Sequence, residues 1–299
     1  MTENKPLAVI TVTYSPGPYL ERFLESVYAG YSGPTYTLLA DNGSADGIPE
    51  EAARERQNVE FLATGGNLGY GAAINAGVRR LNELRRSVGI DSEFFVIVNP
   101  DVEFTAGSID EMIACARRHP QAAAIGPRIQ EPSGSTYPSA RSIPTLGNGI
   151  GHALLGKVWP SNPWTKSYLA DADMDNEREA GWLSGSCLLL RWEAFEKVGG
   201  FDERYFMYME DVDLGDRFGR AGYENVYCPN AVITHAQGHS TNRVSELMLP
   251  AHHASAYRFQ ADRHPGFVAA PLRLVLVTGL KFREFLAVSS ARRRRRTVH

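Results

Sequence analysis

The N-terminal half alternates short apolar runs with longer segments whose apolar positions repeat at helical spacing. The apolar runs, each of which predicts a strand, are Leu7–Tyr14, Tyr36–Ala40, Val59–Leu62 and Phe94–Val98. The predicted helices are Tyr19–Tyr28, Ala72 to about Arg86, and Ser108–Arg118. This alternation predicts the α/β class, with a mostly parallel central sheet flanked by helices. Phe94–Val98 is the most apolar run and is expected at the sheet centre.

The second half continues the alternation less regularly. Its predicted strands are Ala122–Ile129, Gly181–Arg191 and Val226–Ile233. A helix is expected from about Glu210 to the stop signal at Gly222. Residues 137–164 are rich in proline, glycine, serine and aromatic residues, a composition typical of a long binding loop.

Three predicted strands end in polar residues that suit a nucleotide or a metal ion. Ligands of open α/β sheets bind at the carboxyl ends of the strands. Asp41 is therefore a candidate acceptor for a base N–H or a ribose hydroxyl, or else an ordinary turn residue. Asp101 follows Asn99 past the central strand, and His235 follows Val226–Ile233. Together they form a candidate site for a divalent cation that also holds a diphosphate, although a lone histidine is more often structural.

A glycine-rich turn, Gly65–Gly71, opens the helix expected from Ala72. Backbone N–H groups in such a turn can approach a diphosphate, which makes Asn67 and Gly69 candidate nucleotide-binding residues. The turn has neither the lysine of a Walker loop nor the glycine spacing of a dinucleotide-binding fold.

The stretch Gly199–Gly222 concentrates acidic residues behind an apolar lead-in, Phe206–Met209. Glu210 and Asp211 are expected at the edge of a packed pocket, where a raised pKa suits a general base. Their place at a helix start, where the helix dipole favours the ionised form, allows the alternative that they only cap the helix. Trp182 either stacks on a sugar ring or packs in the core.

Composition limits the classes of function. The chain has 299 residues, 43% hydrophobic residues and a net charge of −3, which argues against general nucleic-acid binding. The three cysteines, Cys115, Cys187 and Cys228, show no metal-ligand spacing and no disulfide framework, as expected in a reducing compartment. We expect no signal peptide, and no apolar run is long enough to predict a spanning helix.

Charge is distributed unevenly, because the C-terminal residues from Arg263 onward carry nine basic residues against Glu284 alone. Arg258–Ser290 is expected to be helical, with apolar and basic positions interspersed, and the run Arg292–Arg296 follows it. This composition predicts an amphipathic helix lying on an anionic membrane surface, or alternatively a packing helix with a basic end.

The order of motifs resembles the inverting family 2 glycosyltransferases of the GT-A fold over residues 6–245. The motifs are Asp41-Asn-Gly-Ser-x-Asp46, Gly66-Asn-Leu-Gly-Tyr70, Asn99-Pro-Asp101, Trp182-x-Ser-Gly185, Gly199-Gly-Phe-Asp-Glu203, Glu210-Asp-Val-Asp-Leu214 and His235-x-x-Gly-x-Ser240. Within that family the chain looks most like the actinobacterial rhamnosyltransferases, on the stretches 137–141, 159–164, 181–189, 201–217 and 251–253.

The resemblance implies a catalytic domain over residues 1–245, with a nucleotide-binding half (about 6–118) and an acceptor half (119–245). It implies a membrane-associating tail over 246–299 and a peripheral location at the cytoplasmic face of the cell membrane. The implied reaction moves L-rhamnose from dTDP-L-rhamnose to GlcNAc-diphospho-polyprenol, a step in the synthesis of the cell-wall arabinogalactan linker. A homo-oligomer remains open.

The resemblance also implies roles for individual residues. Asp211 is the expected base, with Glu210 beside it, and Asp101 and His235 are the expected ligands of Mn²⁺ or Mg²⁺. The residues expected to bind the nucleotide or the substrate are Thr13, Tyr14, Asp41, Asn67, Gly69, Asn99, Trp182 and Arg217. The chain departs from the family pattern in keeping one carboxylate of the metal motif, Asp101, and in offering His239 as a second candidate histidine.

Two alternatives remain from the sequence. One is an enzyme of the same fold that uses another nucleotide sugar, such as a UDP-sugar. The other is a non-catalytic nucleotide-sugar-binding protein that acts as an assembly partner. Residue spacing does not distinguish donor sugars, because the sugar is selected by side chains that sequence order does not bring together.

Overall fold

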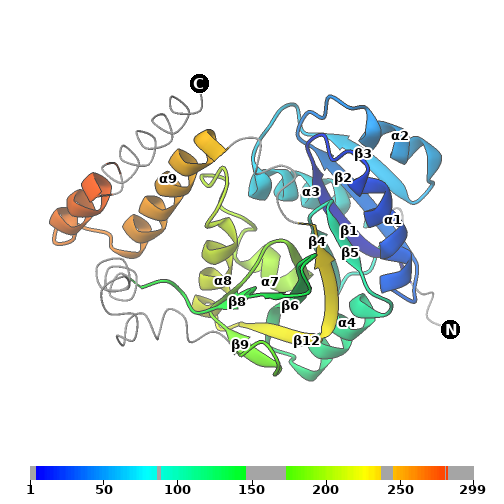
Figure 1. The fold of residues 1–299 in the computed structure, drawn as a ribbon. Coiled ribbons are helices and arrows are strands. Elements are labelled where there is room, and N and C mark those ends of the chain that lie inside the picture. Colours follow the sequence, from blue (N-terminus) through cyan, green and yellow to red (C-terminus); the bar gives the residue numbers. More distant parts are fainter. Residues whose placement is uncertain (1–4, 86–88, 146–172, 237–244, 280, 282–299) are drawn as a thin grey trace.

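A ten-stranded mixed sheet forms the centre of the molecule (Figure 1), in a computed structural model that describes residues 5–85, 89–145, 173–236, 245–279 and 281. The strands are β1 (Leu7–Thr13), β2 (Thr35–Asp41), β3 (Val59–Ala63), β4 (Phe94–Val98), β5 (Val102–Phe104), β6 (Ala122–Gln130), β7 (Thr136–Tyr137), β8 (Ala140–Arg141), β9 (Arg178–Ala180), β10 (Trp182–Leu183), β11 (Cys187–Arg191) and β12 (Glu224–His235). The main path of the sheet runs β3-β2-β1-β4-β11-β6-β12-β5.

Helices cover both faces of this sheet (Figure 1). They are α1 (Tyr19–Gly30), α2 (Ile48–Glu55), α3 (Tyr70–Leu84), α4 (Ser108–Arg118), α7 (Trp192–Lys197), α8 (Glu210–Arg220) and α9 (Ser245–Arg263). The predicted α/β class and the flanking helices are confirmed. The prediction of Phe94–Val98 as the centre is also confirmed, since β4 is buried throughout and lies between β1 and β11.

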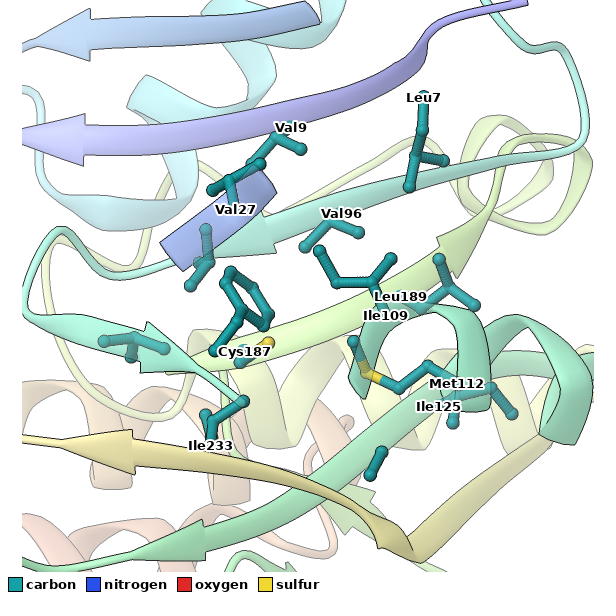
Figure 2. Close-up of a cluster of buried hydrophobic side chains, with 14 of the residues drawn as sticks. Leu7, Val9, Val27, Val96, Ile109, Met112, Ile125, Cys187, Leu189 and Ile233 are labelled. Atoms are coloured by element: carbon teal, nitrogen blue, oxygen red, sulfur yellow. The ribbon is translucent and has the colours of Figure 1, made fainter. Parts of the chain in front are cut away.

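Alternate residues of β1 enter two different cores. Leu7 and Val9 join the cluster shared with α1 and α4, while Ala8 and Ile10 join the cluster shared with α3 and α7. Successive side chains of a strand point to opposite faces, so a strand buried on both sides reads as a continuous apolar run. Figure 2 shows the first cluster, in which Met112 of α4 lies close to Ile125 of β6.

The direction of each strand determines which strand ends meet at one edge of the sheet. β1, β2, β3 and β4 are mutually parallel, and β12 is parallel to β6. β11 runs antiparallel between β4 and β6. Its first residues therefore lie beside the last residues of β4, and Asn99 N donates to Ser186 O at 2.9 Å.

The structure corrects one predicted strand. Gly181–Arg191 is not continuous: β10 pairs with β8 in a separate two-stranded sheet, and β11 begins only at Cys187. The intervening Ser184–Ser186 turns the chain at the cleft. The reason is that Trp182 packs against α8, where a Cβ on Gly215 would lie 2.8 Å from Trp182 Cβ.

The tail is helical in its described part, but not as a single helix from Arg258. α9 begins at Ser245 and ends at Arg263, and a second helical segment covers 270–279. Within the described ranges, no helix combines the length and the apolar character that crossing a membrane requires. Most of the loop 137–164, His239 and the run Arg292–Arg296 lie outside the described residues. The predicted boundaries after residues 118 and 245 stay predictions.

Candidate active site

A cleft of about 500 Å³ lies at the carboxyl ends of β1, β2 and β4. Within the described part of the chain it is lined by Val12, Tyr14, Pro16, Tyr19, Asn42, Asn67, Gly69, Tyr70, Asn99, Pro100, Asp101, Tyr137, Ser184, Gly185, Ser186, Met207, Tyr208, Glu210, Asp211 and His235. Eight of the twelve predicted site residues are in this lining. The other four, Thr13, Asp41, Trp182 and Arg217, lie behind or beside it.

Asp41 is buried at the end of β2, and both of its carboxylate oxygens accept hydrogen bonds. Thr13 Oγ1 donates to Oδ1 at 2.6 Å, and the backbone N–H groups of Gly43 and Ser44 each donate to Oδ2 at 2.9 Å. Asp41 therefore holds the 42–44 turn against the end of β1, in the way expected of a turn residue. Tyr14, the residue after Thr13, is half exposed and lines the cleft.

Asn42 is a cleft residue that the sequence reasoning missed. Its Nδ2 donates to Gly69 O at 3.1 Å, and its Oδ1 accepts from Thr64 Oγ1 at 2.9 Å. These bonds tie the turn after β2 to the glycine-rich turn before α3, across 27 residues of sequence. The signal was present, since Asn42 stands inside the Asp41–Gly47 turn, but a strand-end asparagine alone does not reveal its partner.

Gly69 is needed for backbone reasons. Its φ is +84°, and a Cβ at this position would lie 2.0 Å from the carbonyl oxygen of Phe206. No side chain fits there without moving the 206–209 segment. Met207 and Tyr208 of this segment line the cleft, as does Asn67, whose Oδ1 accepts from Gly69 N at 3.1 Å.

Asp101 and His235 face each other at one end of the cleft. His235 Nε2 lies 3.1 Å from Asp101 Oδ1 and 3.5 Å from Asn99 Nδ2. Antiparallel pairing of β12 with β5 creates this contact, because it places His235 opposite Val102. A carboxylate oxygen and an imidazole nitrogen suit Mn²⁺ or Mg²⁺, with the remaining positions left for diphosphate oxygens and water. No third carboxylate, thiol or imidazole among the described residues joins the pair.

Glu210 and Asp211 begin α8 directly after two residues in left-handed conformation, Tyr208 (φ 67°) and Met209 (φ 68°). Non-glycine residues rarely adopt this conformation, and it turns the acidic pair into the cleft. Asp211 Oδ2 accepts from Gly185 N at 3.0 Å. Tyr70 in turn donates its hydroxyl to Gly185 O at 2.6 Å, so three separate segments fix the orientation of Asp211.

Burial and mutual repulsion determine the pKa values of the two carboxyl groups, Glu210 and Asp211. Burial, with the charge of Asp211 as the second cause, raises the pKa of Glu210 to about 8. Burial also raises the pKa of Asp211, while the hydrogen bond from Gly185 opposes that rise. The predicted raised pKa is thus supported, and the helix dipole does not outweigh desolvation. With a pKa of about 8, Glu210 is mostly protonated at neutral pH.

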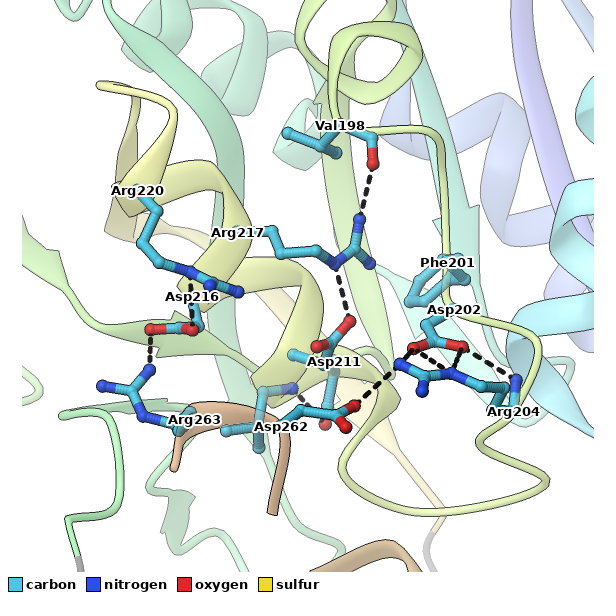
Figure 3. Close-up of polar contacts among 12 residues, drawn as sticks. Val198, Phe201, Asp202, Arg204, Asp211, Asp216, Arg217, Arg220, Asp262 and Arg263 are labelled. Atoms are coloured by element: carbon cyan, nitrogen blue, oxygen red, sulfur yellow. Dashed lines mark hydrogen bonds and ion pairs between the residues drawn. The ribbon is translucent and has the colours of Figure 1, made fainter. Parts of the chain in front are cut away.

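The side chains of Trp182 and Arg217 contact other parts of the protein beside the cleft and do not line it. Trp182 Nε1 donates to Ser142 O at 3.1 Å, and the ring packs with Tyr205, Val212 and Phe259. Arg217 donates to Asp213 Oδ2 at 2.7 Å. It also donates to Val198 O at 2.9 Å, a contact that Figure 3 shows. The predicted contacts of these two residues with substrate stay predictions, since both residues lie beside the cleft.

The tail helix α9 is tied to the elements that carry the acidic pair (Figure 3). Arg263 pairs with Asp216 of α8, and Arg204 Nη2 lies 2.7 Å from Asp262 Oδ2. Ser255 Oγ also donates to Met207 O at 2.9 Å. The tail therefore packs against the 201–209 loop, a contact that no local sequence pattern indicated.

The comparisons with known proteins agree with this geometry. Residues 8–199 match the family model described as glycosyl transferase family 2, so the chain belongs to that family and is a glycosyltransferase. It is 52% identical over 293 residues, 97% of this chain and 95% of the relative, to the N-acetylglucosaminyl-diphospho-decaprenol L-rhamnosyltransferase of Mycobacterium tuberculosis. It is also 24% identical to the rhamnosyltransferase WbbL of Escherichia coli, over 85% of this chain and 92% of that one. The predicted family and enzyme class are confirmed.

Solved structures confirm the GT-A fold. The mannosyltransferase PcManGT of Pyrobaculum calidifontis, in complex with GDP-Man and Mn²⁺, superposes with a TM-score of 0.58 at 16% identity, over 93% of this chain and 70% of that one. GalNAc-T7 with UDP, GalNAc and Mn²⁺ gives 0.54 at 12% identity, over 79% and 44%. At these identities the likeness establishes the fold alone.

Proposed function

We propose that this enzyme transfers L-rhamnose from dTDP-L-rhamnose to the GlcNAc of a polyprenyl-diphosphate-linked acceptor, with inversion at the anomeric carbon. The observation that carries the proposal is the 52% identity along 97% of the chain to a relative named for rhamnosyl transfer to N-acetylglucosaminyl-diphospho-decaprenol. The resemblance to the enzymes of the arabinogalactan linker points to the same step.

The cleft geometry supports a single displacement. Asp211, held by Gly185 N, removes the proton of the acceptor hydroxyl as that oxygen attacks the sugar. Asp101 and His235 would hold Mn²⁺ or Mg²⁺, and such an ion would supply positive charge to the leaving diphosphate. Asn67 and the backbone of the 65–71 turn lie at the opening of α3, where a helix N-terminus favours the same negative charge. One base and no covalent nucleophile invert the configuration.

The test is dTDP release by the purified full chain with Mn²⁺, dTDP-L-rhamnose and a short GlcNAc-diphospho-lipid. We expect release only when both metal and acceptor are present, with rhamnose on the lipid product. Parallel reactions contain UDP-sugars, since the neighbouring folds bind GDP-Man or UDP. Turnover with a UDP-sugar alone would assign another donor to the same site. Binding of nucleotide without turnover of any donor would favour the non-catalytic alternative.

We also propose that the tail places the enzyme on the anionic cytoplasmic face of the membrane, where a polyprenyl acceptor resides. Phe267 and Val268 are 96% and 99% exposed in the turn before the 270–279 segment, and Leu274 and Val275 are more than half exposed on it. Exposed apolar side chains beside basic residues are typical of an interfacial helix. These exposed side chains favour a membrane-surface role for the tail, although α9 itself packs against α8.

The double variant Phe267→Ser with Val268→Ser should reduce co-flotation with anionic vesicles by about tenfold or more, because two apolar side chains lose their lipid contact. The measurement is the fraction of full-length protein that floats with phosphatidylglycerol-containing vesicles. Tyr28→Ser, at a 54% exposed position on α1, serves as the matched control and should float as the parent does. Equal flotation of all three proteins contradicts the proposal.

A further inference from the structure

Two cysteines that are far apart in sequence meet on the side of the sheet covered by α4. Cys115 lies on α4 and Cys228 lies on β12, and both are fully buried. Glu177, just before β9, reaches the same point. The two sulfur atoms and a carboxylate oxygen of Glu177 all lie within 4.8 Å of one another. This cluster, Cys115–Glu177–Cys228, is distinct from the Asp101–His235 pair in the cleft.

The spacing suits a thiophilic metal ion. Two sulfur ligands on one zinc ion are at most about 4.6 Å apart, twice the Zn–S bond length of about 2.3 Å, and a tetrahedral angle brings them closer. Small rotations of the three side chains would bring their ligand atoms within bonding distance of one ion. Glu111 lies next to the cluster without belonging to it: its Oε1 lies 4.0 Å from Cys228 Sγ and accepts from Arg118 Nη2 at 2.9 Å. Hard cations such as Mg²⁺ do not favour thiolates, which distinguishes this cluster from the cleft.

Neighbouring side chains fix Glu177 in the way that outer ligands orient a metal-binding carboxylate. Arg118 Nη2 donates to its Oε2 at 2.6 Å, and His119 Nε2 lies 2.8 Å from its Oε1. Arg118 Nε also donates to Oε1 at 3.3 Å, so Oε1 has two partners, while the second lone pair of Oε2 leaves a position for an ion. Two thiolates and one carboxylate carry three negative charges, which a divalent ion and Arg118 balance.

We propose that Cys115, Cys228 and Glu177 bind a structural zinc ion that fastens α4 to β12. Binding releases the two thiol protons to solvent. Cys228 stands seven residues before His235 on β12. Cys115 is on α4, the element after β5, and β5 begins directly after Asp101. The proposed ion would therefore brace β12, which carries His235, against α4, without contacting the substrate.

The experiment is a Co²⁺ titration of the reduced, chelator-stripped full chain, followed by displacement with Zn²⁺. We expect about one ion per chain to produce a cobalt–thiolate charge-transfer band, which Zn²⁺ abolishes. Zinc should also raise the melting temperature by about 5 °C. Asp101→Asn should leave the band unchanged, because the cleft pair contains no sulfur.

Variants separate ligand loss from misfolding. Cys115→Ser and Cys228→Ser should lose the band, whereas Cys187→Ala, which alters the remaining buried cysteine, should keep it. Glu177→Gln keeps both thiols and changes a side chain that is 25% exposed. We expect metal affinity to fall about 10–100-fold with the circular dichroism spectrum intact. The proposal is overturned if the wild type shows no thiolate band, if Cys228→Ser keeps it, or if the purified chain holds Cys115 and Cys228 as a disulfide.

Discussion

The Asp211→Asn variant should lose about 10²–10⁴-fold in turnover while still binding the donor. In the parent, Gly185 N lies 3.0 Å from Asp211 Oδ2. Asparagine retains an oxygen that can accept this hydrogen bond, so the cleft should keep its shape. What it loses is the ability to take the proton of the acceptor hydroxyl. The measurements are kcat for rhamnosyl transfer and calorimetric binding of dTDP with Mn²⁺.

Glu210→Gln is the matched control for the neighbouring acid. Glutamine has the charge of the protonated glutamic acid, and the pKa of Glu210 is raised to about 8, so this variant should keep most of its activity at neutral pH. Above pH 8 the parent gains a second buried charge beside Asp211, and the variant does not. Its pH profile should therefore lack any change near pH 8. If Glu210→Gln is as inactive as Asp211→Asn, the base assignment to Asp211 is wrong.

The Asp101→Asn variant should lower kcat/KM by about 10²–10³-fold, because a bound cation contributes several kcal/mol to stabilising the leaving diphosphate. Donor binding should also lose its dependence on Mn²⁺. His235 Nε2, 3.1 Å from Asp101 Oδ1, would remain as a single ligand. The measurements are metal-dependent dTDP binding and the Mn²⁺ concentration for half-maximal activity.

Asp175→Asn is a suitable control for Asp101→Asn. Asp175 is an exposed carboxylate whose partner is Arg128 at 3.3 Å, and neither residue lines the cleft within the described ranges. It should leave both activity and metal dependence unchanged. An Asp101→Asn enzyme that still requires Mn²⁺ at the parent's concentration would assign the ion to other residues.

The strands of the first half were predictable because each is short, apolar and bounded by a turn. Phe94–Val98 was identified as central from its five apolar residues alone, and the structure buries all five. The prediction failed at Gly181–Arg191, where two apolar runs separated by Ser184–Ser186 belong to two sheets. There, Trp182 joins β8 and packs on α8 while Cys187 starts β11, and hydrophobic pattern cannot distinguish these environments.

The candidate site was partly readable for a different reason. Asp101, Asp211 and His235 follow or begin elements whose ends meet at one sheet edge, so the motif order suggested a common cleft. Thr13, Asp41, Trp182 and Arg217 were placed with them, but they lie behind or beside the lining. Asn42 was overlooked, since its role depends on a hydrogen bond to Gly69 O across 27 residues.

The sequence by itself determined the α/β alternation, the glycine-rich turn before α3, and the acidic start of α8, because periodicity and turn chemistry act over a few neighbouring residues. Only the tertiary structure decided which distant groups meet. Strand order and direction bring His235 to Asp101 across 134 residues, and Cys228 to Cys115 across a similar interval. Burial, also a tertiary property, raises the pKa of both Glu210 and Asp211. Such contacts depend on how the sheet is assembled, and local pattern does not encode that assembly.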